Sequence, residues 1–377
     1  MRKILLIPAL FVVLNAFAVP KVTVTVKNQA PLQRNNEIVE LSLKKVIAKL
    51  GLKADETFIV KDSKAKQVPY QITNCSETKA SFLLFPATVK ANGTSVYIIQ
   101  KGAPEPFAPK VYGRLVPERK DDFTWENDRV AFRVYGPALQ ATGEVSSGID
   151  VWSKRTDKLV IDKWYADELA GKKTYHTDGG EGLDMYKVGP TLGAGAAAPY
   201  LEDKLWFSKN FVKHQVLENG PLRMTVKLEY APFMAGNTEV TETRIISLDA
   251  GNQLNKITLN YSFKGTSLPV AAGIVMRNSS EEKTDVSPSK SYFLHAEPED
   301  KANGIIYTAV VGVKPFTQID TKNGHIFGVQ NVKSAEKYVY YQGAGWSKWG
   351  FATFDDWKKY VADFSLKIKK PLVVTVK

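Results

Sequence analysis

The chain has 377 residues, of which 44% are hydrophobic and 11% aromatic, a composition that excludes an intrinsically disordered protein. Its formal net charge of +12 favours an acidic partner. Lysine and arginine are spread along the chain without a dense run, a zinc-finger spacing or an RNA-binding motif, which argues against nucleic acid.

Residues 1–18 have the pattern of an export signal. Arg2 and Lys3 form a basic start, an apolar run follows from residue 4 to residue 14, and Ala16-Phe17-Ala18 resembles a cleavage site. The apolar run is too short to cross a bilayer, and no membrane span is predicted elsewhere. We therefore expect a periplasmic or secreted protein, for which an acidic polysaccharide is a better partner than nucleic acid.

Residues 19–105 are expected to form a small β-sandwich. The segment 21–27 alternates lysine or threonine with valine, as a half-buried strand does, and short strands follow between turn residues. One helix is predicted over 40–52, where apolar side chains recur at helical spacing and Gly51 ends the pattern. The proline-rich stretch 102–117 then marks the passage to a second domain, residues 106–377.

The segment 125–135 predicts one long strand with two different faces. Alternate positions place Trp125, Asn127, Arg129 and Arg133 on the same face. Aromatic rings beside guanidinium and amide groups are typical of a sugar-binding cleft, where rings stack on sugars and fixed donors bind hydroxyl and carboxylate groups. The alternative is an exposed polar face whose arginines are paired with acids.

The glycine-rich segment 174–199 is the best candidate for an active-site loop, although a mobile surface loop is the plainer interpretation. Between its glycines it carries several ionisable residues: Tyr175, His176, Asp178, Glu181, Asp184, Tyr186 and Lys187. A carboxylate beside an imidazole orients the ring and raises its basicity, so His176 is the predicted general base.

A divalent metal is the rival interpretation of this loop, with His176, Asp178, Glu181 and Asp184 as its ligands. Their spacing matches no standard metal motif. The chain also lacks the Gly-rich motifs of nucleotide sites and the G-x-S-x-G motif of serine hydrolases. We therefore expect no cofactor, with the metal site kept as the alternative.

The rest of the chain predicts strands up to residue 377, including one over 160–165 and a last one over 371–377. A helix is predicted over 355–364. Glycines surround Trp346 and Trp349, and each ring either stacks on a sugar or only fills the groove between the domains. Many long strands with few helices favour a mostly β fold with two large stacked antiparallel sheets.

Three motifs carry a resemblance to a known family: residues 117–129, 175–189 and 345–347. Together they resemble an exported bacterial family long described as a domain of unknown function, similar to the oligosaccharide dehydratases of ulvan breakdown. The resemblance implies a galactose-mutarotase-like β-supersandwich behind the small β-sandwich. It also implies removal of water from the non-reducing uronic acid of an acidic oligosaccharide, which leaves a 4,5-unsaturated sugar.

Elimination of this kind needs a cation for the sugar carboxylate, a base for the C5 proton and an acid for the leaving hydroxyl. We expect Arg129, beside Asn127, to hold the carboxylate, and His176 to be the base. The remaining predicted catalytic residues are Tyr186 or Tyr175 as the acid, Lys187 as a second cation, and Asp178 or Glu181 to orient the imidazole. The predicted substrate-binding residues are Trp125, Asn127, Arg129, Arg133, Asp184 and Trp346.

Three other functions fit the same residues. A polysaccharide lyase would use the same proton abstraction to break the glycosidic bond. A glycosidase would use two of Asp178, Glu181 and Asp184. A non-catalytic protein would only bind acidic glycans.

Overall fold

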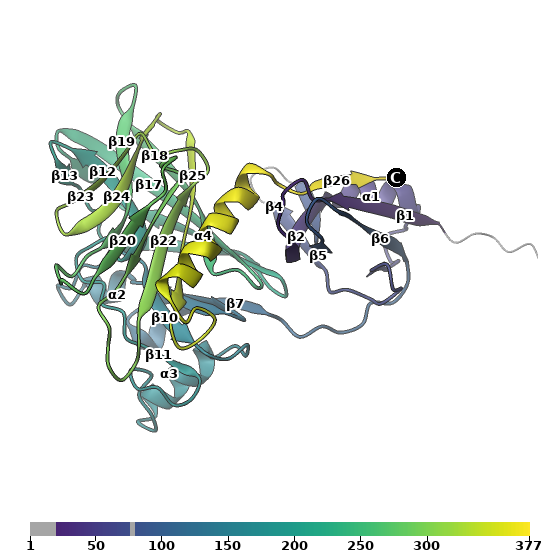
Figure 1. The fold of residues 1–377 in the computed structure, drawn as a ribbon, viewed down its shortest axis with the longest axis horizontal. Helices are drawn as coiled ribbons and strands as arrows, with labels where there is room; N and C mark the ends of the chain where they lie inside the picture. The colour runs from purple at the N-terminus through teal and green to yellow at the C-terminus, as the bar shows by residue number, and fades with distance from the viewer. Residues whose placement is uncertain (1–19, 76–79) are drawn as a thin grey trace, which may run out of the picture.

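The computed structural model describes residues 20–75 and 80–377, which form a small and a large β domain side by side (Figure 1). The predicted export signal, residues 1–18, lies outside the described residues. Every strand pairing among the named strands is antiparallel, which confirms the prediction of a mostly β fold built from antiparallel sheets. Of the helices that the structure describes, none has the length and apolarity needed to cross a membrane.

The small domain is a sandwich of two sheets. The first has the order β26-β1-β6-β3, and the second has the order β2-β5-β4. Valines of β1, which alternate inward as predicted, share one core with apolar residues of β2 and β5. The strands are β1 (Lys21–Lys27), β2 (Arg34–Ser42), β3 (Phe58–Lys61), β4 (Gln71–Cys75), β5 (Ala80–Val89), β6 (Thr94–Lys101) and β26 (Val373–Val376).

The helix predicted over 40–52 is shorter in the structure, because β2 continues to Ser42 before α1 (Leu43–Leu50) begins. Gly51 ends the helix as predicted, with a φ of 61°, a left-handed conformation that glycine adopts without strain. Val46 and Leu50 are buried against the sheets. The helix therefore covers one edge of the small core.

The last strand was assigned to the second domain by the boundary at residue 106, but β26 pairs with β1 in the small domain. α4 (Phe354–Lys369) leads the chain back from the large domain to this sheet (Figure 1). The sequence could not predict this pairing, because an edge strand can pair with a strand that lies far away along the chain. The first and last strands that the structure describes therefore pair in the same sheet.

The large domain packs a nine-stranded sheet against two five-stranded sheets, and one core cluster contains residues of all three. The first five-stranded sheet has the order β11-β10-β9-β8-β7, and its strands are β7 (Val111–Val116), β8 (Asp122–Asn127), β9 (Val130–Val134), β10 (Asp150–Lys154) and β11 (Gly182–Asp184). The second has the order β13-β12-β19-β24-β23, and its strands are β12 (Ala194–Leu201), β13 (Lys204–Leu205), β19 (Leu268–Val275), β23 (Gln318–Lys322) and β24 (His325–Val332).

The nine-stranded sheet has the order β14-β15-β17-β18-β25-β22-β21-β20, with β16 added beside β17. Its strands are β14 (Phe211–Asn219), β15 (Arg223–Tyr230), β16 (Phe233–Ala235), β17 (Thr238–Asp249), β18 (Leu254–Phe263), β20 (Lys283–Val286), β21 (Tyr292–Ala296), β22 (Ile306–Gly312) and β25 (Lys337–Trp346).

This sheet is buried on both faces around β22. Ile306 and Val310 point into the large core, while Tyr307, Ala309 and Val311 belong to a separate cluster with α4. A strand that is covered on both sides reads as an almost continuous apolar run, as this one does. The inner face of the nine-stranded sheet is therefore the face that meets the two five-stranded sheets.

The helix predicted over 355–364 is α4, and its first turn is held by a capping box. The Thr353 hydroxyl accepts a hydrogen bond from the Asp356 backbone N–H, and the Asp356 carboxylate accepts one from the Thr353 backbone N–H. Trp357, Val361 and Phe364 pack on the outer face of the nine-stranded sheet. α2 (Pro137–Gln140) and the 3-10 turn η1 (Pro117–Arg119) are short connections.

The strand predicted over 160–165 is wrong, because this segment begins α3 (Ile161–Leu169). Ile161, Trp164 and Tyr165 are all buried, and their spacing of three and four residues places them on one helix face. The first turn is anchored by Glu126, whose carboxylate accepts hydrogen bonds from the backbone N–H groups of Val160 and Ile161 at 2.7 and 2.8 Å. Glu126 lies on β8, so the sequence around residues 160–165 gave no sign of this anchor.

Candidate functional site

The predicted single strand over 125–135 is instead a hairpin of β8 and β9. The side-chain oxygen of Asn127 accepts hydrogen bonds from the backbone N–H groups of Arg129 and Val130 at 2.8 and 3.1 Å, which closes a tight turn. Trp125 consequently lies directly opposite Phe132. The turn reverses the alternation, so Trp125 and Arg133 occupy different faces.

Two of the predicted sugar-binding residues are structural for this reason. Trp125 is fully buried, stacks on Phe132 and donates a hydrogen bond from its indole N–H to Asn255 at 2.7 Å. The amide of Asn127 donates to the backbone carbonyls of Asp249 and Asn252, both at 2.7 Å. The predictions that Trp125 stacks on a sugar and that Asn127 binds one are therefore wrong.

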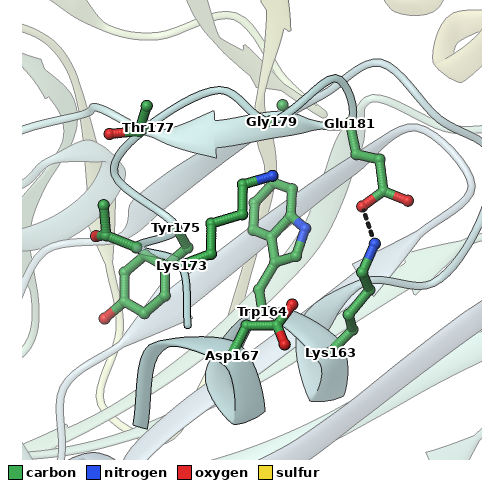
Figure 2. A pocket seen from close by; sticks show the side chains of 10 residues that line it. Lys163, Trp164, Asp167, Lys173, Tyr175, Thr177, Gly179 and Glu181 are labelled. Carbon is green, nitrogen blue, oxygen red and sulfur yellow. Dashed lines mark hydrogen bonds and ion pairs between the residues drawn. The ribbon is translucent and has the colours of Figure 1, made fainter. Parts of the chain in front are cut away.

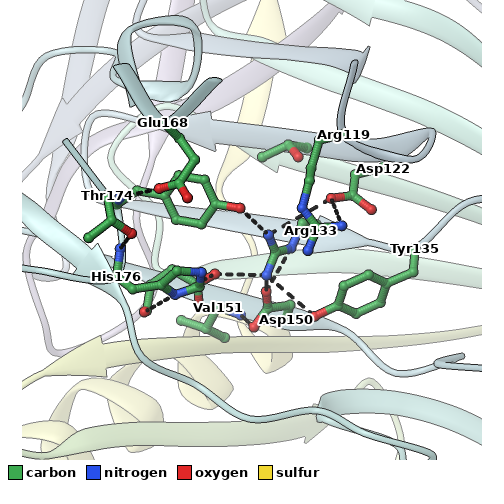
Figure 3. Close-up of polar contacts among 12 residues, drawn as sticks. Arg119, Asp122, Arg133, Tyr135, Asp150, Val151, Glu168, Thr174 and His176 are labelled. Carbon is green, nitrogen blue, oxygen red and sulfur yellow. Dashed lines mark hydrogen bonds and ion pairs between the residues drawn. The ribbon is translucent and has the colours of Figure 1, made fainter. Parts of the chain in front are cut away.

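Arg133 lies at the centre of a buried cluster of charges, which Figure 3 shows. Its guanidinium donates to Asp150 at 2.9 Å through Nε and to Asp184 at 2.7 Å through Nη2. Asp122 lies 3.8 Å from Nη1, and the Tyr135 and Tyr175 hydroxyls each lie 3.4 Å from a guanidinium nitrogen. The residues come from the neighbouring strands β8, β9, β10 and β11, so we call this group the Arg133 cluster.

Arg133 was predicted to bind substrate, but its guanidinium is held by protein carboxylates, and only 5% of its side chain is exposed. Asp184, also predicted to bind substrate, is 2% exposed and is held by the same guanidinium. Both predictions of direct substrate contact are wrong, because each residue is the other's partner. The alternative stated for these arginines, pairing with acids, holds for Arg133.

The Arg133 cluster contains more acid than base. Burial, and then the charge of Asp150, raise the pKa of Asp184 to about 8, while burial raises the pKa of Asp122 to about 6 against the opposing charges of Arg133 and Arg119. Three carboxyl groups face two guanidinium groups, so one bound proton makes the cluster neutral. The raised pKa of Asp184 places that proton there near neutral pH.

The Asp184→Asn variant tests whether Asp184 carries this proton. The folded-state pKa of Asp184 lies above its ordinary value, so the stability that this group contributes is complete below about pH 4 and is lost as the pH rises through its folded value of about 8. We expect the free energy of unfolding of the wild type to fall across this window by at least about 1 kcal/mol more than that of Asp184→Asn.

Urea unfolding at a series of pH values measures how the free energy of unfolding of each protein changes with pH. Asp162→Asn is the matched control, because Asp162 pairs with Arg114 but its side chain is 62% exposed. Equal pH slopes for the wild type and Asp184→Asn would show that Asp184 is ionised throughout.

His176 lies at the edge of the Arg133 cluster, where 55% of its side chain is exposed. Its Nδ1 lies 3.0 Å from the backbone carbonyl of Asp184 and 3.7 Å from the carboxylate of the same residue. A carbonyl oxygen only accepts, so Nδ1 carries the proton of the neutral ring and donates it. The other nitrogen, Nε2, then keeps its lone pair.

The loop that carries His176 is held by aromatic packing beneath it. Tyr175 is buried, and its ring lies 4.8 Å from the ring of Trp152, which in turn stacks on Trp164 of α3. The backbone N–H of Tyr175 donates to Glu168 at 3.1 Å. Tyr175 therefore fixes the position of the neighbouring imidazole.

The prediction that Asp178 or Glu181 orients His176 is wrong, because Asp184 does so. Asp178 accepts hydrogen bonds from the backbone N–H groups of Gly180 and Gly182 and pairs with Arg155 at 3.0 Å. Glu181 pairs with Lys163 of α3 at 2.6 Å.

Figure 2 shows Glu181 and Lys163 on the rim of a small pocket between α3 and the loop. Its walls also include Lys173, Tyr175 and Thr177. Asp178 and Glu181 therefore hold the loop in shape.

Arg129 and Trp346, both predicted to bind substrate, line a common small pocket with Ser153 and Trp349. Arg129 lies 5.9 Å from the centre of the Trp349 ring, whereas Trp346 is 3% exposed and donates to the carbonyl of Asn303. Arg129 is at the turn end of β9 and Arg133 is at its other end. The structure therefore does not bring Arg129 and His176 into one pocket.

Tyr186 and Lys187 follow the Arg133 cluster along the chain. Tyr186 is buried, and its ring lies 5.0 Å from the guanidinium of Arg277, whereas Lys187 is exposed. Burial raises the pKa of Tyr186 well above its ordinary value, and the charges of Glu297 and Asp150 raise it further. Tyr186 therefore stays protonated. The negative charges of Asp150 in the Arg133 cluster and of Glu297 beyond it both act on its hydroxyl.

Several polar residues of this region were not singled out by sequence reasoning. Arg119 lies 3.9 Å from Asp122, and its side chain is 32% exposed. Arg277, His295 and Glu297 form a second group of contacts beside Tyr186. The signal for Arg119 was its place in the motif 117–129, but the other three stand in ordinary strand sequence, which gave no sign of them.

The rival metal interpretation finds no support in the geometry of the loop. Among the residues that the structure describes, no group of three or more histidine, cysteine, aspartate or glutamate side chains is arranged to hold a metal ion. Of the four residues proposed as ligands, Asp178 and Glu181 are engaged with Arg155 and Lys163.

Residues 26–374 match the model of a family described as "Domain of unknown function (DUF4861)". A relative named "Uncharacterized protein P7", from Formosa agariphila, is 31% identical over 371 residues, which cover 94% of this chain and 93% of the relative. Both matches extend through the two domains.

Two solved structures from Enterococcus faecalis resemble the fold. One is a protein in glycosyl hydrolase family 38, with a TM-score of 0.55 and 10% identity over 96% of this chain and 48% of that one. The other is an alpha-mannosidase, with a TM-score of 0.51 and 10% identity over 96% of this chain and 46% of that one. The chain thus spans about half the length of either structure, and at this identity the likeness shows the fold alone.

Proposed function

Since the chain belongs to the family described as a domain of unknown function, DUF4861, we propose that it is a periplasmic or secreted carbohydrate-active lyase. It eliminates water from the uronic acid at the non-reducing end of an acidic oligosaccharide, of which ulvan fragments are one example, and leaves a 4,5-unsaturated uronate. One observation carries the proposal: the exposed imidazole of His176, with Nδ1 on the Asp184 carbonyl and Nε2 free to accept a proton.

His176 is the base of the proposed reaction. Its Nε2 takes the proton from C5, which is acidic because it lies next to the sugar carboxylate. The imidazolium that forms donates to the Asp184 carbonyl and lies 3.7 Å from the Asp184 carboxyl group. The Asp184 backbone carbonyl thus gives the transient positive charge a fixed hydrogen-bond acceptor.

Arg119 replaces Arg129 as the proposed cation for the sugar carboxylate. It belongs to the surroundings of the Arg133 cluster, as Figure 3 shows, and one third of its side chain is exposed. Its Nη1 has no hydrogen-bond partner within the described residues. A carboxylate beside Arg119 would gain a charge-assisted hydrogen bond, which stabilises the enolate-like intermediate. Lys187 remains the proposed second cation.

Tyr186 is favoured over Tyr175 as the proposed acid. The Tyr175 hydroxyl lies 3.4 Å from Arg133, whereas the Tyr186 hydroxyl is buried without a hydrogen-bond partner among the described residues. As the C4–O bond breaks, the phenol proton passes to the leaving hydroxyl, which departs as water, and the C5–H electrons form the C4–C5 double bond. The proton on His176 later restores the phenol through solvent.

The test is to incubate the purified protein with a panel of acidic oligosaccharides and to follow ultraviolet absorbance and product mass together. We expect an absorbing product that has lost one water and kept its chain length. Absorbing products of shorter length would instead indicate a polysaccharide lyase, and shorter products without absorbance a glycosidase. Unchanged oligosaccharides that bind the protein would indicate a glycan-binding protein.

A further inference from the structure

A second group of polar side chains lies beside Tyr186, where His295 and Thr308 of the nine-stranded sheet face Arg277, which follows β19 of a five-stranded sheet. The Nε of Arg277 donates to Glu297 at 2.7 Å, and Nε2 of His295 lies 3.0 Å from Glu282. Glu297 and His295 are two residues apart on and just after β21, so they share a face. Thr308 of β22 lies directly opposite His295. We call these residues the Arg277 group.

Tyr186 and each member of the Arg277 group except Glu282 keep a buried polar atom without a hydrogen-bond partner in the described part of the chain. The donors are Nη2 of Arg277 and the hydroxyl of Tyr186, and the acceptors are Oε1 of Glu297 and Nδ1 of His295. The Thr308 hydroxyl, which both donates and accepts, is the fifth. Tyr186, His295 and Thr308 are each at least nine-tenths buried.

The role of His295 as an acceptor follows from its surroundings. Burial lowers the pKa of its imidazole, so the ring is neutral and carries one proton. Nε2 donates that proton to the Glu282 carboxylate, which leaves a lone pair on Nδ1. The nearest charged group, Oε1 of Glu297, lies 3.7 Å from Nδ1 and is itself an acceptor, so no hydrogen bond forms between them.

A buried polar atom without a hydrogen-bond partner destabilises the folded state, and folded proteins keep few of them. Five in one contact chain therefore indicate a place built for a ligand. Arg277 and Glu297 are the partly exposed members, with side chains 23% and 14% exposed, so a ligand would reach the group from their side.

The charges decide what kind of ligand fits. Arg277 contributes one positive charge, and Glu282 and Glu297 contribute two negative charges, so the group has a net charge of −1 with His295 neutral. A carboxylate or sulfate would be repelled. Hydroxyl groups suit the site, because each donates one hydrogen bond and accepts others, and the wall offers both donors and acceptors.

We propose that the Arg277 group is a subsite for neutral sugar hydroxyls, which holds the C4 hydroxyl that leaves and its C3 neighbour on the terminal ring. This inference rests on the proposed function, because it places Tyr186 between the reacting ring and the subsite. The subsite repels the ring's carboxylate and so directs it toward Arg119. It also selects a terminal uronate, since an internal one has no free C4 hydroxyl when the chain is linked through that oxygen.

The test uses two probes that cannot be dehydrated. One is an oligosaccharide whose terminal uronate has been reduced to the alcohol, which keeps both hydroxyls but lacks the acidic C5 proton. The other is the same molecule without the C4 hydroxyl. By calorimetry we expect the wild type to bind the first roughly tenfold to a hundredfold more tightly, because losing the hydroxyl leaves buried polar groups unpaired.

The variants Arg277→Met and Thr308→Val are expected to lose this preference, while Lys204→Met, an exposed cation over the Trp206 ring, keeps it. Equal binding of the two probes by the wild type, or no binding of either, would overturn the subsite without any variant. A retained preference in both variants would do the same. If the preference is found but no oligosaccharide is dehydrated, the subsite stands and the proposed reaction falls.

Discussion

The variant His176→Gln is expected to form unsaturated product roughly 10²–10⁴-fold more slowly than the wild type. Glutamine keeps a side-chain N–H that can donate to the Asp184 carbonyl, where Nδ1 of the imidazole lies at 3.0 Å. It has no basic nitrogen, so it cannot take the C5 proton. The loss is measured as the initial rate of absorbance increase with a saturating acidic oligosaccharide.

His214→Gln is the matched control for this experiment. His214 is also exposed on the large domain, but it packs beside Phe123 and Phe211, with ring centres 5.8 and 6.4 Å away. We expect its rate to equal that of the wild type. A His176→Gln enzyme that works at the wild-type rate would remove His176 from the mechanism, whatever the substrate proves to be.

The variant Arg133→Met is expected to lose about 3–5 kcal/mol of stability, the largest effect on folding that we foresee. Methionine is similar in length and apolar, but it leaves Asp150 and Asp184 buried without their cation, and both are at most 2% exposed. Removing one partner of a buried ion pair costs far more than the pair itself contributes. Urea unfolding near neutral pH measures the loss.

Two comparisons sharpen this prediction. Arg155→Met removes an arginine whose side chain is 36% exposed and pairs with Asp178, and it is expected to cost less than about 1 kcal/mol. The cost of Arg133→Met should also shrink as the pH falls through about 8 and then about 6, the raised pKa values of Asp184 and Asp122, because the orphaned carboxyl groups then become neutral. An Arg133→Met penalty no greater than that of Arg155→Met would show that the cluster tolerates the loss of its cation.

The two proposals place two edges of the sugar ring in surroundings of opposite charge. On the Arg119 side, the guanidinium nitrogen Nη1 lies 3.9 Å from Asp122 and has no hydrogen-bond partner among the described residues, whereas the Arg277 group has a net negative charge with partners for hydroxyls. A uronate has one anionic edge and one edge of hydroxyls, so only one orientation satisfies both sides. That orientation would bring C5 toward His176 and the C4 hydroxyl toward Tyr186.

The candidate site could be predicted in part. The mixture of imidazole, carboxylate and phenol in the glycine-rich segment singled out His176, Asp184 and Tyr186, all of which lie in or beside the Arg133 cluster. The partner of each residue could not be predicted. Asp178 and Glu181 are nearer to His176 in sequence, yet Asp184 orients it because β11 pairs with β10 and brings its carboxylate to Arg133.

The sequence by itself determined the local structure. Alternating valines made β1 a half-buried strand, Gly51 ended α1, and the apolar spacing of residues 357, 361 and 364 made α4 a covering helix. These features depend on neighbours within a few residues, for which periodicity and capping are direct evidence.

Only the tertiary structure decided which residues meet. The turn at Asn127 buried Trp125 and separated it from Arg133, and β26 returned to β1. Arg277, just after β19, came together with His295 of β21 and Thr308 of β22. The physical reason is that strand pairing and burial depend on the whole sheet, so a side chain's partners are set by register across strands and not by its place along the chain.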